Sequence, residues 1–265
     1  MESISSAASH TLPTNSLDRG LAVMELLVAH PRGLTHTEIA RFLGVPSSTC
    51  SYITRKLMAG GYLRREPASG RFRLGLKTVS LAHGALHGLG FRSISEPVLY
   101  RLTEETGLSA GIGVLHGATV LVVDRVDGQD VLAGIMGGAK RHSRARENRD
   151  IGRELPLHSS ALGKVLLAYL DKADFEERAV ELTAGLRKQL NGVRKQGYAT
   201  AQELYVSIRA LAVPIVDPAG RARAALSLNG DSSAAVWADM PALLSQVQVA
   251  AAEIARQSRY LWIQD

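Results

Sequence analysis

The chain contains a single cysteine, Cys50, among its 265 residues. One thiol excludes an internal disulfide framework and any zinc site built from cysteines. The chain also lacks an apolar run of 18 residues, so no segment is expected to span a membrane. Residues 1–15 are polar and lack the apolar centre of a signal peptide, which favours a disordered tail. We therefore expect a soluble, cytoplasmic protein.

Motifs that mark common enzymes are missing as well. The segment Ala161–Lys164 ends like a phosphate-binding loop, but His158 replaces the first glycine and Val165 stands where Ser or Thr is needed. The glycines of segment Gly111–Gly117 miss the dinucleotide-binding spacing by one residue. No GxSxG elbow occurs. We therefore expect that the protein is not an enzyme and that it binds no cofactor.

The histidines give no better case for catalysis or metal binding. His158 precedes Ser159 and Ser160, but no carboxylate is placed by the sequence to orient it, so helix capping is the preferred role for this segment. His83 and His87 lie four residues apart without a third ligand nearby, which favours a solvated or interface pair. We therefore expect no catalytic residues and no metal site.

Positive charge is concentrated near the N-terminus. Residues 1–83 hold ten Lys and Arg against five Asp and Glu, whereas residues 84–265 hold 21 against 20. A basic module on a nearly neutral body points to an anionic polymer bound at one end. Nucleic acid fits better than a membrane surface, because no Lys-rich amphipathic helix with bulky apolar residues is present.

The stretch from Leu34 to Gly61 has the pattern of a helix-turn-helix. Thr35 and Glu38 form a capping-box pair, so a helix should begin at His36. Gly44 is suited to end this helix, and Pro46 is suited to the first turn of the next. Two short helices joined by a turn of about three residues have the helix-turn-helix spacing.

The second helix of this pair has two contrasting sides. Cys50, Ile53 and Leu57 lie within one arc and should face the first helix. The opposite arc carries hydroxyls, a phenol and a guanidinium, which donate hydrogen bonds to phosphates and base edges. An ordinary amphipathic hairpin in a small helical bundle would show the same pattern.

The flanking segments favour DNA binding. Ser16 is suited to cap a helix over Leu17–His30, and Tyr62–Arg65 and Arg71–Leu74 flank a Pro- and Gly-containing turn like the strands of a wing. A surface hairpin with solvated charges would leave the density of arginines in this wing unexplained. The candidate DNA-contacting residues are Thr35, Thr37, Ser47, Ser48, Ser51, Tyr52, Arg55, Arg64, Arg71 and Arg73.

The remaining chain predicts a linker helix and a larger second domain. We expect boundaries at 16–74 for the winged helix-turn-helix, 75–90 for the linker helix and 91–265 for the second domain. Helices and mostly antiparallel strands without regular alternation give the fold class α+β. In the second domain we expect strands over 109–115, 119–126, 131–135, 210–216 and 221–228, and helices over 94–106, 159–170, 174–182, 186–196 and 239–260.

The motifs and their order resemble the IclR (isocitrate lyase regulator) family of bacterial transcription factors. The resemblance rests on LDRGLAVMELL at 17–27, LTHTEIARFLGVPSSTCSYITRKL at 34–57, GRFRLG at 70–75, LPLHSSALGKVLLA at 155–168, and GYATAQEL followed by RALAVPIVDPAGRARAALSLNG. It implies a winged helix that binds a roughly palindromic double-stranded DNA operator. It also implies a GAF-like domain with an antiparallel sheet that binds a small organic acid, and a homodimer or tetramer.

The resemblance also implies which residues contact the effector. In the family, backbone groups at the start of the LPLHSSALGK helix and polar side chains of the last strand hold the ligand's carboxylate. The matching residues here are Ala161, Leu162, Ser227 and Asn229, with Ile208 and Ala210 on the adjacent segment. Free N–H groups at a helix N-terminus favour such an anion.

The predicted function is therefore a sequence-specific DNA-binding transcriptional regulator whose operator binding responds to a small metabolite. Two alternatives stay open at this point. One is a metabolite sensor that acts through protein partners without DNA, against which the N-terminal charge excess argues. The other is an enzyme, for which no residue geometry can be argued from the sequence.

Overall fold

The computed structural model describes residues 15–88, 90–128, 151–171, 174–175, 183–203 and 207–259. The chain forms two compact units, residues 1–88 and 89–265, which are treated separately below. The expected strand at 131–135 lies outside the described residues, as does most of the expected helix at 174–182. None of the described helices is long and apolar enough to cross a membrane.

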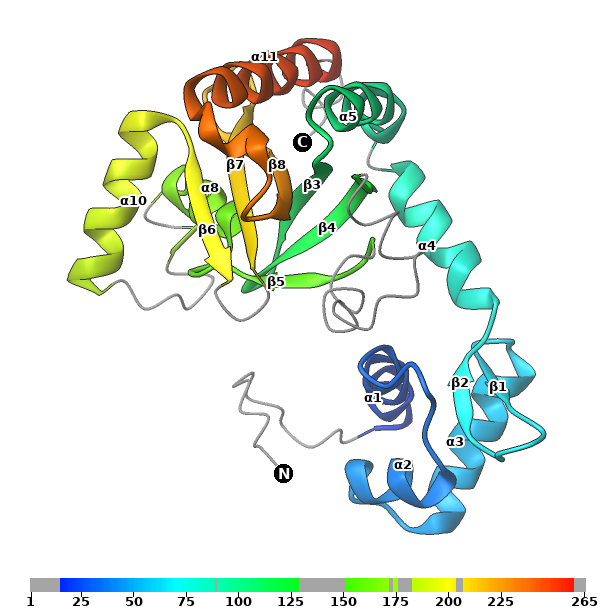
Figure 1. Ribbon diagram of the computed structural model, residues 1–265. Helices are drawn as coiled ribbons and strands as arrows, with labels where there is room; N and C mark the ends of the chain where they lie inside the picture. Colours follow the sequence, from blue (N-terminus) through cyan, green and yellow to red (C-terminus); the bar gives the residue numbers. More distant parts are fainter. Residues whose placement is uncertain are drawn as a thin grey trace. The chain divides into compact units, whose positions relative to one another are not determined.

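The first unit is a winged helix-turn-helix (Figure 1). The wing is antiparallel, with Leu63 opposite Leu74 and Arg65 opposite Phe72. One apolar core that includes Val23, Ile39 and Cys50 joins the helices to the wing. The elements are α1 (Ser16–Val28), α2 (His36–Leu43), α3 (Ser47–Ala59), β1 (Leu63–Arg65), β2 (Phe72–Leu74) and α4 (Lys77–Gly88).

Local chemistry sets the ends of these helices. The Thr35–Glu38 capping box is present in full, and Gly44 ends α2 in the left-handed region with φ of 64°. The cap of α1 was predicted wrongly: Asn15, not Ser16, accepts hydrogen bonds from the N–H groups of Leu17 and Asp18. Ser and Asn are both good capping residues, so side-chain propensity could not choose between these neighbours.

The second unit is built on a six-stranded antiparallel sheet with the strand order β5-β4-β3-β8-β7-β6 (Figure 1). The last two strands in sequence, β7 and β8, pair along nearly their full lengths across the turn at Asp217–Gly220. The strands are β3 (Ser109–His116), β4 (Thr119–Val126), β5 (Glu154–Pro156), β6 (Ala199–Glu203), β7 (Ile208–Val216) and β8 (Ala222–Asp231).

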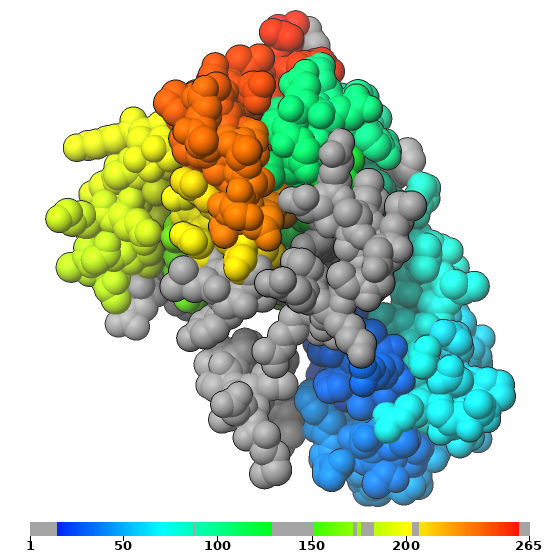
Figure 2. All heavy atoms as spheres, viewed as in Figure 1, coloured from blue at the N-terminus to red at the C-terminus, as the bar shows by residue number. Residues whose placement is uncertain are grey.

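Helices cover both faces of this sheet. Helices α5 (Arg92–Thr106) and α11 (Met240–Ser258) lie side by side on one face, and their surfaces adjoin in Figure 2. Helices α8 (Ala161–Ala168) and α10 (Ala184–Gln196) pack on the other face, where α8 contacts β7 and β8. A short 3-10 helix, η3 (Ala235–Ala238), precedes α11.

The α+β class, the winged helix-turn-helix and the antiparallel sheet are as predicted. Strand β4 begins and ends where expected, and most other elements differ by a few residues at their ends. Strands β5 and β6 were not predicted, because a three-residue strand ending in Pro156 and the polar segment Ala199–Glu203 carry little strand pattern of their own. Their pairing with β4 and β7 forms both edges of the sheet.

Candidate functional site

Helix α3 presents a polar surface opposite its buried side. Cys50 and Ile53 are buried as expected, and Thr54 is buried as well, with its hydroxyl donating to the carbonyl of Cys50 at 2.9 Å. The side chains of Ser47, Ser48, Ser51, Tyr52 and Arg55 are all exposed. The exposed side of α3 therefore carries hydrogen-bond donors suited to phosphates and base edges.

Several predicted contact residues already have partners within the unit. The hydroxyl of Thr35 accepts from the N–H of Glu38 and donates to its carboxylate, so this side chain serves the helix cap. The hydroxyl of Ser51 lies 2.9 Å from Nε2 of His36, while Thr37 on the first turn of α2 is exposed. His36 was not among the sequence candidates, and this contact places its ring beside the polar surface of α3.

The wing arginines differ in how they are held. Arg71 donates to the carbonyl of Gly33 at 2.8 Å and pairs with Glu38 at 3.1 Å. Arg73 pairs with Glu66 at 3.1 Å, whereas Arg64 is exposed. Arg71 and Arg73 thus fix the wing to the helices and to its own turn, and Arg64 is the better placed of the three to meet an external phosphate.

Glu38 joins α2 to the wing within the winged helix-turn-helix of residues 16–74, which is called the reading head from here on. Hydrogen bonds from the backbone and hydroxyl of Thr35 lower the pKa of Glu38, and the nearby charges of Arg71 and Arg41 lower it further. The carboxylate is therefore ionised at neutral pH. One carboxylate oxygen, Oε2, accepts hydrogen bonds both from the N–H of Thr35, the N-cap of α2, and from Nη1 of Arg71 in the wing.

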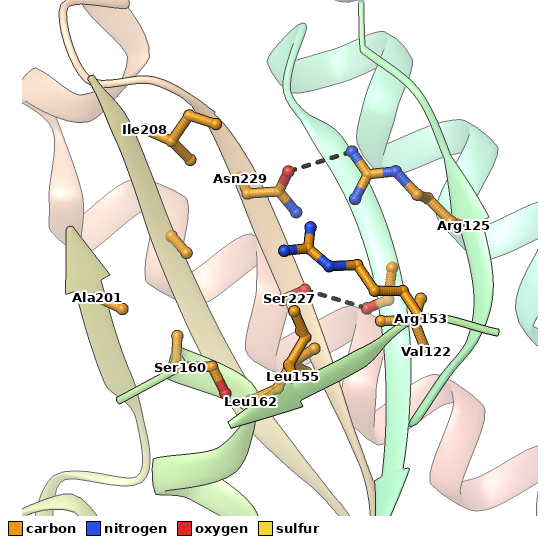
Figure 3. A pocket seen from close by; sticks show the side chains of 13 residues that line it. Val122, Arg125, Arg153, Leu155, Ser160, Leu162, Ala201, Ile208, Ser227 and Asn229 are labelled. Atoms are coloured by element: carbon orange, nitrogen blue, oxygen red, sulfur yellow. Dashed lines mark hydrogen bonds between the residues drawn. The ribbon is translucent and has the colours of Figure 1, made fainter. Parts of the chain in front are cut away.

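The second unit contains a cavity of about 110 Å³ between α8 and the sheet. Its lining is mostly apolar with polar groups at both ends (Figure 3). All six residues predicted for the effector, Ala161, Leu162, Ile208, Ala210, Ser227 and Asn229, line it. The other described lining residues are Gly111, Val122, Arg125, Arg153, Leu155, Ser160 and Ala201.

The register of the sheet brings the polar side chains together. Ser227 and Asn229 are two residues apart on β8 and so point to the same face. Gly111 of β3 pairs with Ser227 on one side and with Arg125 of β4 on the other. Arg125 reaches across β3 and donates from Nη2 to Oδ1 of Asn229 at 3.2 Å (Figure 3).

The first turn of α8 forms one end of the cavity. Ser160 caps the helix, accepting from the N–H of Gly163 at 3.0 Å and donating to the carbonyl of Pro156. Among the described residues, the N–H groups of Ala161 and Leu162 have no hydrogen-bond partner. These two donors, with the positive end of the helix dipole, make this end of the cavity favourable for an anion.

Gly163 allows this turn to approach the backbone of Leu157, the residue after β5, closely. A Cβ atom at Gly163 would lie 2.6 Å from Cα and C of Leu157, which no side chain can occupy without moving the backbone. At Gly113 of β3, a Cβ would lie 3.1 Å from the side chain of Leu162. The position of α8 therefore depends on glycine at two separate contacts, one with Leu157 and one between Leu162 and β3.

Two arginines that line the cavity, Arg125 and Arg153, were not among the residues predicted to contact the effector. Strict alternation along β4 would put Val122 and Arg125 on opposite faces, but the register slips at Val123 and brings both to the cavity. Arg153 precedes β5, and its carbonyl accepts from the N–H of Val122 at 2.9 Å. No local pattern signals a bulge or a three-residue edge strand, so these positions depend on tertiary pairing.

Both units resemble known families. Residues 16–67 match the IclR helix-turn-helix domain, and residues 83–256 match the family described as bacterial transcriptional regulator IclR C-terminal. The HTH-type transcriptional regulator XynR of Escherichia coli K12 is 29% identical over 258 residues, 92% of this chain and 97% of XynR. The glycerol operon regulatory protein of Streptomyces coelicolor is 32% identical over 213 residues, 76% of this chain and 79% of its own length.

Solved structures show the same fold. A crystal structure of an IclR homologue from Microbacterium hydrocarbonoxydans, complexed with 4-hydroxybenzoate, superposes with a TM-score of 0.74. It is 24% identical, and the match covers 93% of this chain and 100% of that one. The IclR of Thermotoga maritima superposes with a TM-score of 0.66 at 21% identity, covering 92% and 98% of the two chains.

Proposed function

Because the chain belongs to the IclR family of bacterial transcriptional regulators, we propose that it binds a specific operator and that a small organic acid in the cavity of the second unit modulates this binding. The relatives named above are DNA-binding transcriptional regulators. The observation that carries the effector part is the convergence of polar groups from α8, β4 and β8 on one cavity.

The chemistry of the cavity supports an anionic ligand. The N–H groups of Ala161 and Leu162, which have no partner among the described residues, and the guanidinium of Arg125 face it. Apolar walls exclude water and strengthen such contacts. The bound 4-hydroxybenzoate in the Microbacterium homologue adds support, since that ligand is a small acid in a protein of the same fold.

The exposed side chains of the reading head favour DNA as the anionic polymer that the protein binds. Arg55 and Ser48 are exposed on α3, Arg64 is exposed on the wing, and the module holding them is basic. In a winged helix-turn-helix the second helix of the motif enters the major groove. We propose that α3 reads base edges there and that the N-terminus of α2, with Thr37, meets the backbone.

The proposed mechanism is a shift between two populations. A homodimer or tetramer would present paired reading heads to the two half-sites of a roughly palindromic operator. Effector binding in the second unit would change the relative placement of these heads through α4. Binding weakens or strengthens DNA affinity to the extent that the effector prefers one arrangement over the other.

A binding experiment with the purified protein and its own promoter DNA tests this proposal. Affinity should fall on the order of a hundredfold or more between about 50 and 200 mM salt if several phosphates are contacted. A small acid that stabilises the protein thermally should also change this affinity. Ser227→Ala should reduce that response while leaving ligand-free DNA binding intact. A flat salt response would instead favour a sensor that acts without DNA.

A further inference from the structure

We propose that the effector is a short dicarboxylic acid, with one carboxylate at the start of α8 and the other at the guanidinium groups of Arg125 and Arg153. This inference rests on the proposed function and narrows its ligand class. The cavity offers hydrogen-bond donors at both ends, and among the described residues no carboxylate lines it.

The end at α8 is built for one carboxylate. Ala161 and Leu162 point two backbone N–H groups outward from the helix, and neither has a partner among the described residues. The hydroxyl protons of Ser160 and Ser227 are given to the carbonyls of Pro156 and Gly111. A carboxylate accepts hydrogen bonds and donates none, so it matches this pair of N–H donors.

The opposite end is built around Arg125. Its side chain is only 10% exposed, and its Nε is paired with Asp127 at 2.7 Å. This pairing fixes the plane of the guanidinium and leaves the Nη groups directed to Asn229 and the cavity. Because Oδ1 of Asn229 already accepts from Arg125, the amide nitrogen of Asn229 remains as a further donor.

Arg153 adds a second guanidinium to the same end. Arg153 directly precedes the edge strand β5 and lies beside Val122, and its guanidinium group points toward Asn229 in Figure 3. Guanidinium groups bind carboxylates through paired N–H donors, which gives geometric selectivity as well as charge. Arg125 and Arg153 thus place guanidinium N–H donors at the end of the cavity away from the start of α8.

The donor-rich lining excludes several ligand classes. An ammonium group would lie near two guanidinium groups, and Asp127, the carboxylate paired with Arg125, is not among the described lining residues that could accept from it, so amino acids and amines are disfavoured. Leu155, Leu162 and Ile208 supply apolar walls suited to a short carbon backbone. The cavity has a volume of about 110 Å³, which favours a short carbon chain between the two carboxylates.

The first test compares acids of equal length. Calorimetry and thermal shift on the full chain would use dicarboxylates from malonate to adipate, and for each length the monocarboxylate and the ω-amino acid. The dicarboxylate of best length should bind at least tenfold more tightly than the monocarboxylate. The amino acid should give no shift. Phosphate and citrate buffers are left out because they are themselves anionic competitors.

The second test removes the arginine end. Arg153→Met should lower dicarboxylate affinity at least tenfold and abolish the preference over the monocarboxylate, whose own affinity should change little. Arg125→Met should do the same, with a thermal scan to check folding because Asp127 loses its partner. Arg187→Met on the exposed surface of α10 is the matched control, since it removes the same charge without touching the cavity.

The outcomes separate this inference from the proposed function. If a monocarboxylate binds as tightly as the dicarboxylate and still changes operator affinity, the ligand class is wrong and the effector function stands. Tight binding of an ω-amino acid would also overturn the ligand class. If no acid in the series binds but an aromatic acid such as 4-hydroxybenzoate does, only this inference fails. If neither the series nor an aromatic acid binds, the effector function itself fails as well. If Arg153→Met and Arg187→Met lower the dicarboxylate affinity equally, Arg153 acts only through the net charge of the protein and does not contact the ligand.

Discussion

Asp124 and Arg125 are neighbours on β4 whose side chains serve opposite faces of the sheet. Arg125 lies in the cavity and donates to Asn229, whereas Asp124 is buried under α5 and accepts from the hydroxyl of Ser95 at 2.7 Å. Asp124 also lies 3.5 Å from Nε of Arg92, in the first turn of α5. The strand segment that shapes the cavity thus also holds the helix that follows α4 in the chain.

Removing the Asp124 carboxylate should destabilise the second unit. Asp124→Ala removes the ion-pair partner of Arg92 and one acceptor of the buried Ser95 hydroxyl, which keeps the carbonyl of Arg92 at 3.0 Å. This loss should cost about 1–3 kcal/mol in the free energy of unfolding. Urea denaturation followed by circular dichroism measures this. Ser95→Ala should cost less, about 1 kcal/mol, because the carboxylate keeps its backbone donor at Arg125. A change below about 0.5 kcal/mol for Asp124→Ala would mean that this contact is not needed.

Arg55→Ala should reduce operator discrimination. If Arg55 donates to a base edge, the substitution should lower the preference for operator over unrelated DNA by about 1–3 kcal/mol. Competition gel shifts at fixed salt measure the ratio of the two affinities. Arg64→Ala serves as the comparison, because a phosphate contact from the wing should weaken both affinities alike. An unchanged ratio in Arg55→Ala would remove this residue from base reading.

Gly163→Ala should damage the cavity, and Gly192→Ala is its matched control. The added methyl at Gly163 must displace the backbone of Leu157 or the first turn of α8, so we expect a loss of several degrees in Tm and weaker ligand binding. A Cβ at Gly192 on α10 meets nothing within 4 Å. Gly192→Ala should therefore be neutral or stabilise by up to about 1 kcal/mol. Similar effects of the two substitutions would contradict the close approach.

Stability at acid pH should depend on Asp217 in the turn between β7 and β8. Burial would raise its pKa, but hydrogen bonds from the backbone of Arg221 and from the side chains of Arg223 and Arg221 lower the pKa below its ordinary value of 3.8. The ionised form therefore stabilises the fold above about pH 4, and this stabilisation is lost as the pH falls through the lowered value. Asp217→Asn should cost about 1–3 kcal/mol at pH 7, and its difference from the parent should shrink toward pH 2. A difference that stays constant with pH would refute the ionic role.

Cys50 should be inert in the folded protein. Its thiol is buried against α2, and burial raises its pKa above the ordinary value of 9.0. Since the thiolate is the reactive form, labelling with a thiol reagent at pH 7.5 should be slow until denaturant is added. Mild peroxide should likewise leave DNA affinity unchanged. Rapid labelling of the native protein would reopen a redox role for this residue.

The sequence predicted features that are encoded by adjacent residues. The capping box at Thr35 and Glu38, the left-handed Gly44 and the Asp217–Gly220 turn all depend on chemistry within a few positions. The effector positions came from the family resemblance, and the register of β8 against β3 and β7 explains why they share one cavity.

Features that depend on distant pairing could not be predicted. The bulge at Val123 turns Arg125 toward the cavity, and it is defined only by the pairing of β4 with β3. Arg153 acquires a place there only because β5 pairs with β4. In the reading head, Arg71 looked like an exposed DNA contact, yet its partners Gly33 and Glu38 lie more than 30 residues away in the chain.

The shared role of Glu38 limits how this reading head can diverge. Any substitution of Glu38 that releases Arg71 also removes the side chain that completes the cap of α2. The position of the wing and the N-terminal cap of α2 therefore depend on the same side chain, and the two form one module. New operator preferences are more readily acquired at Ser48 or Arg55, whose side chains are exposed and hold no part of that module in place.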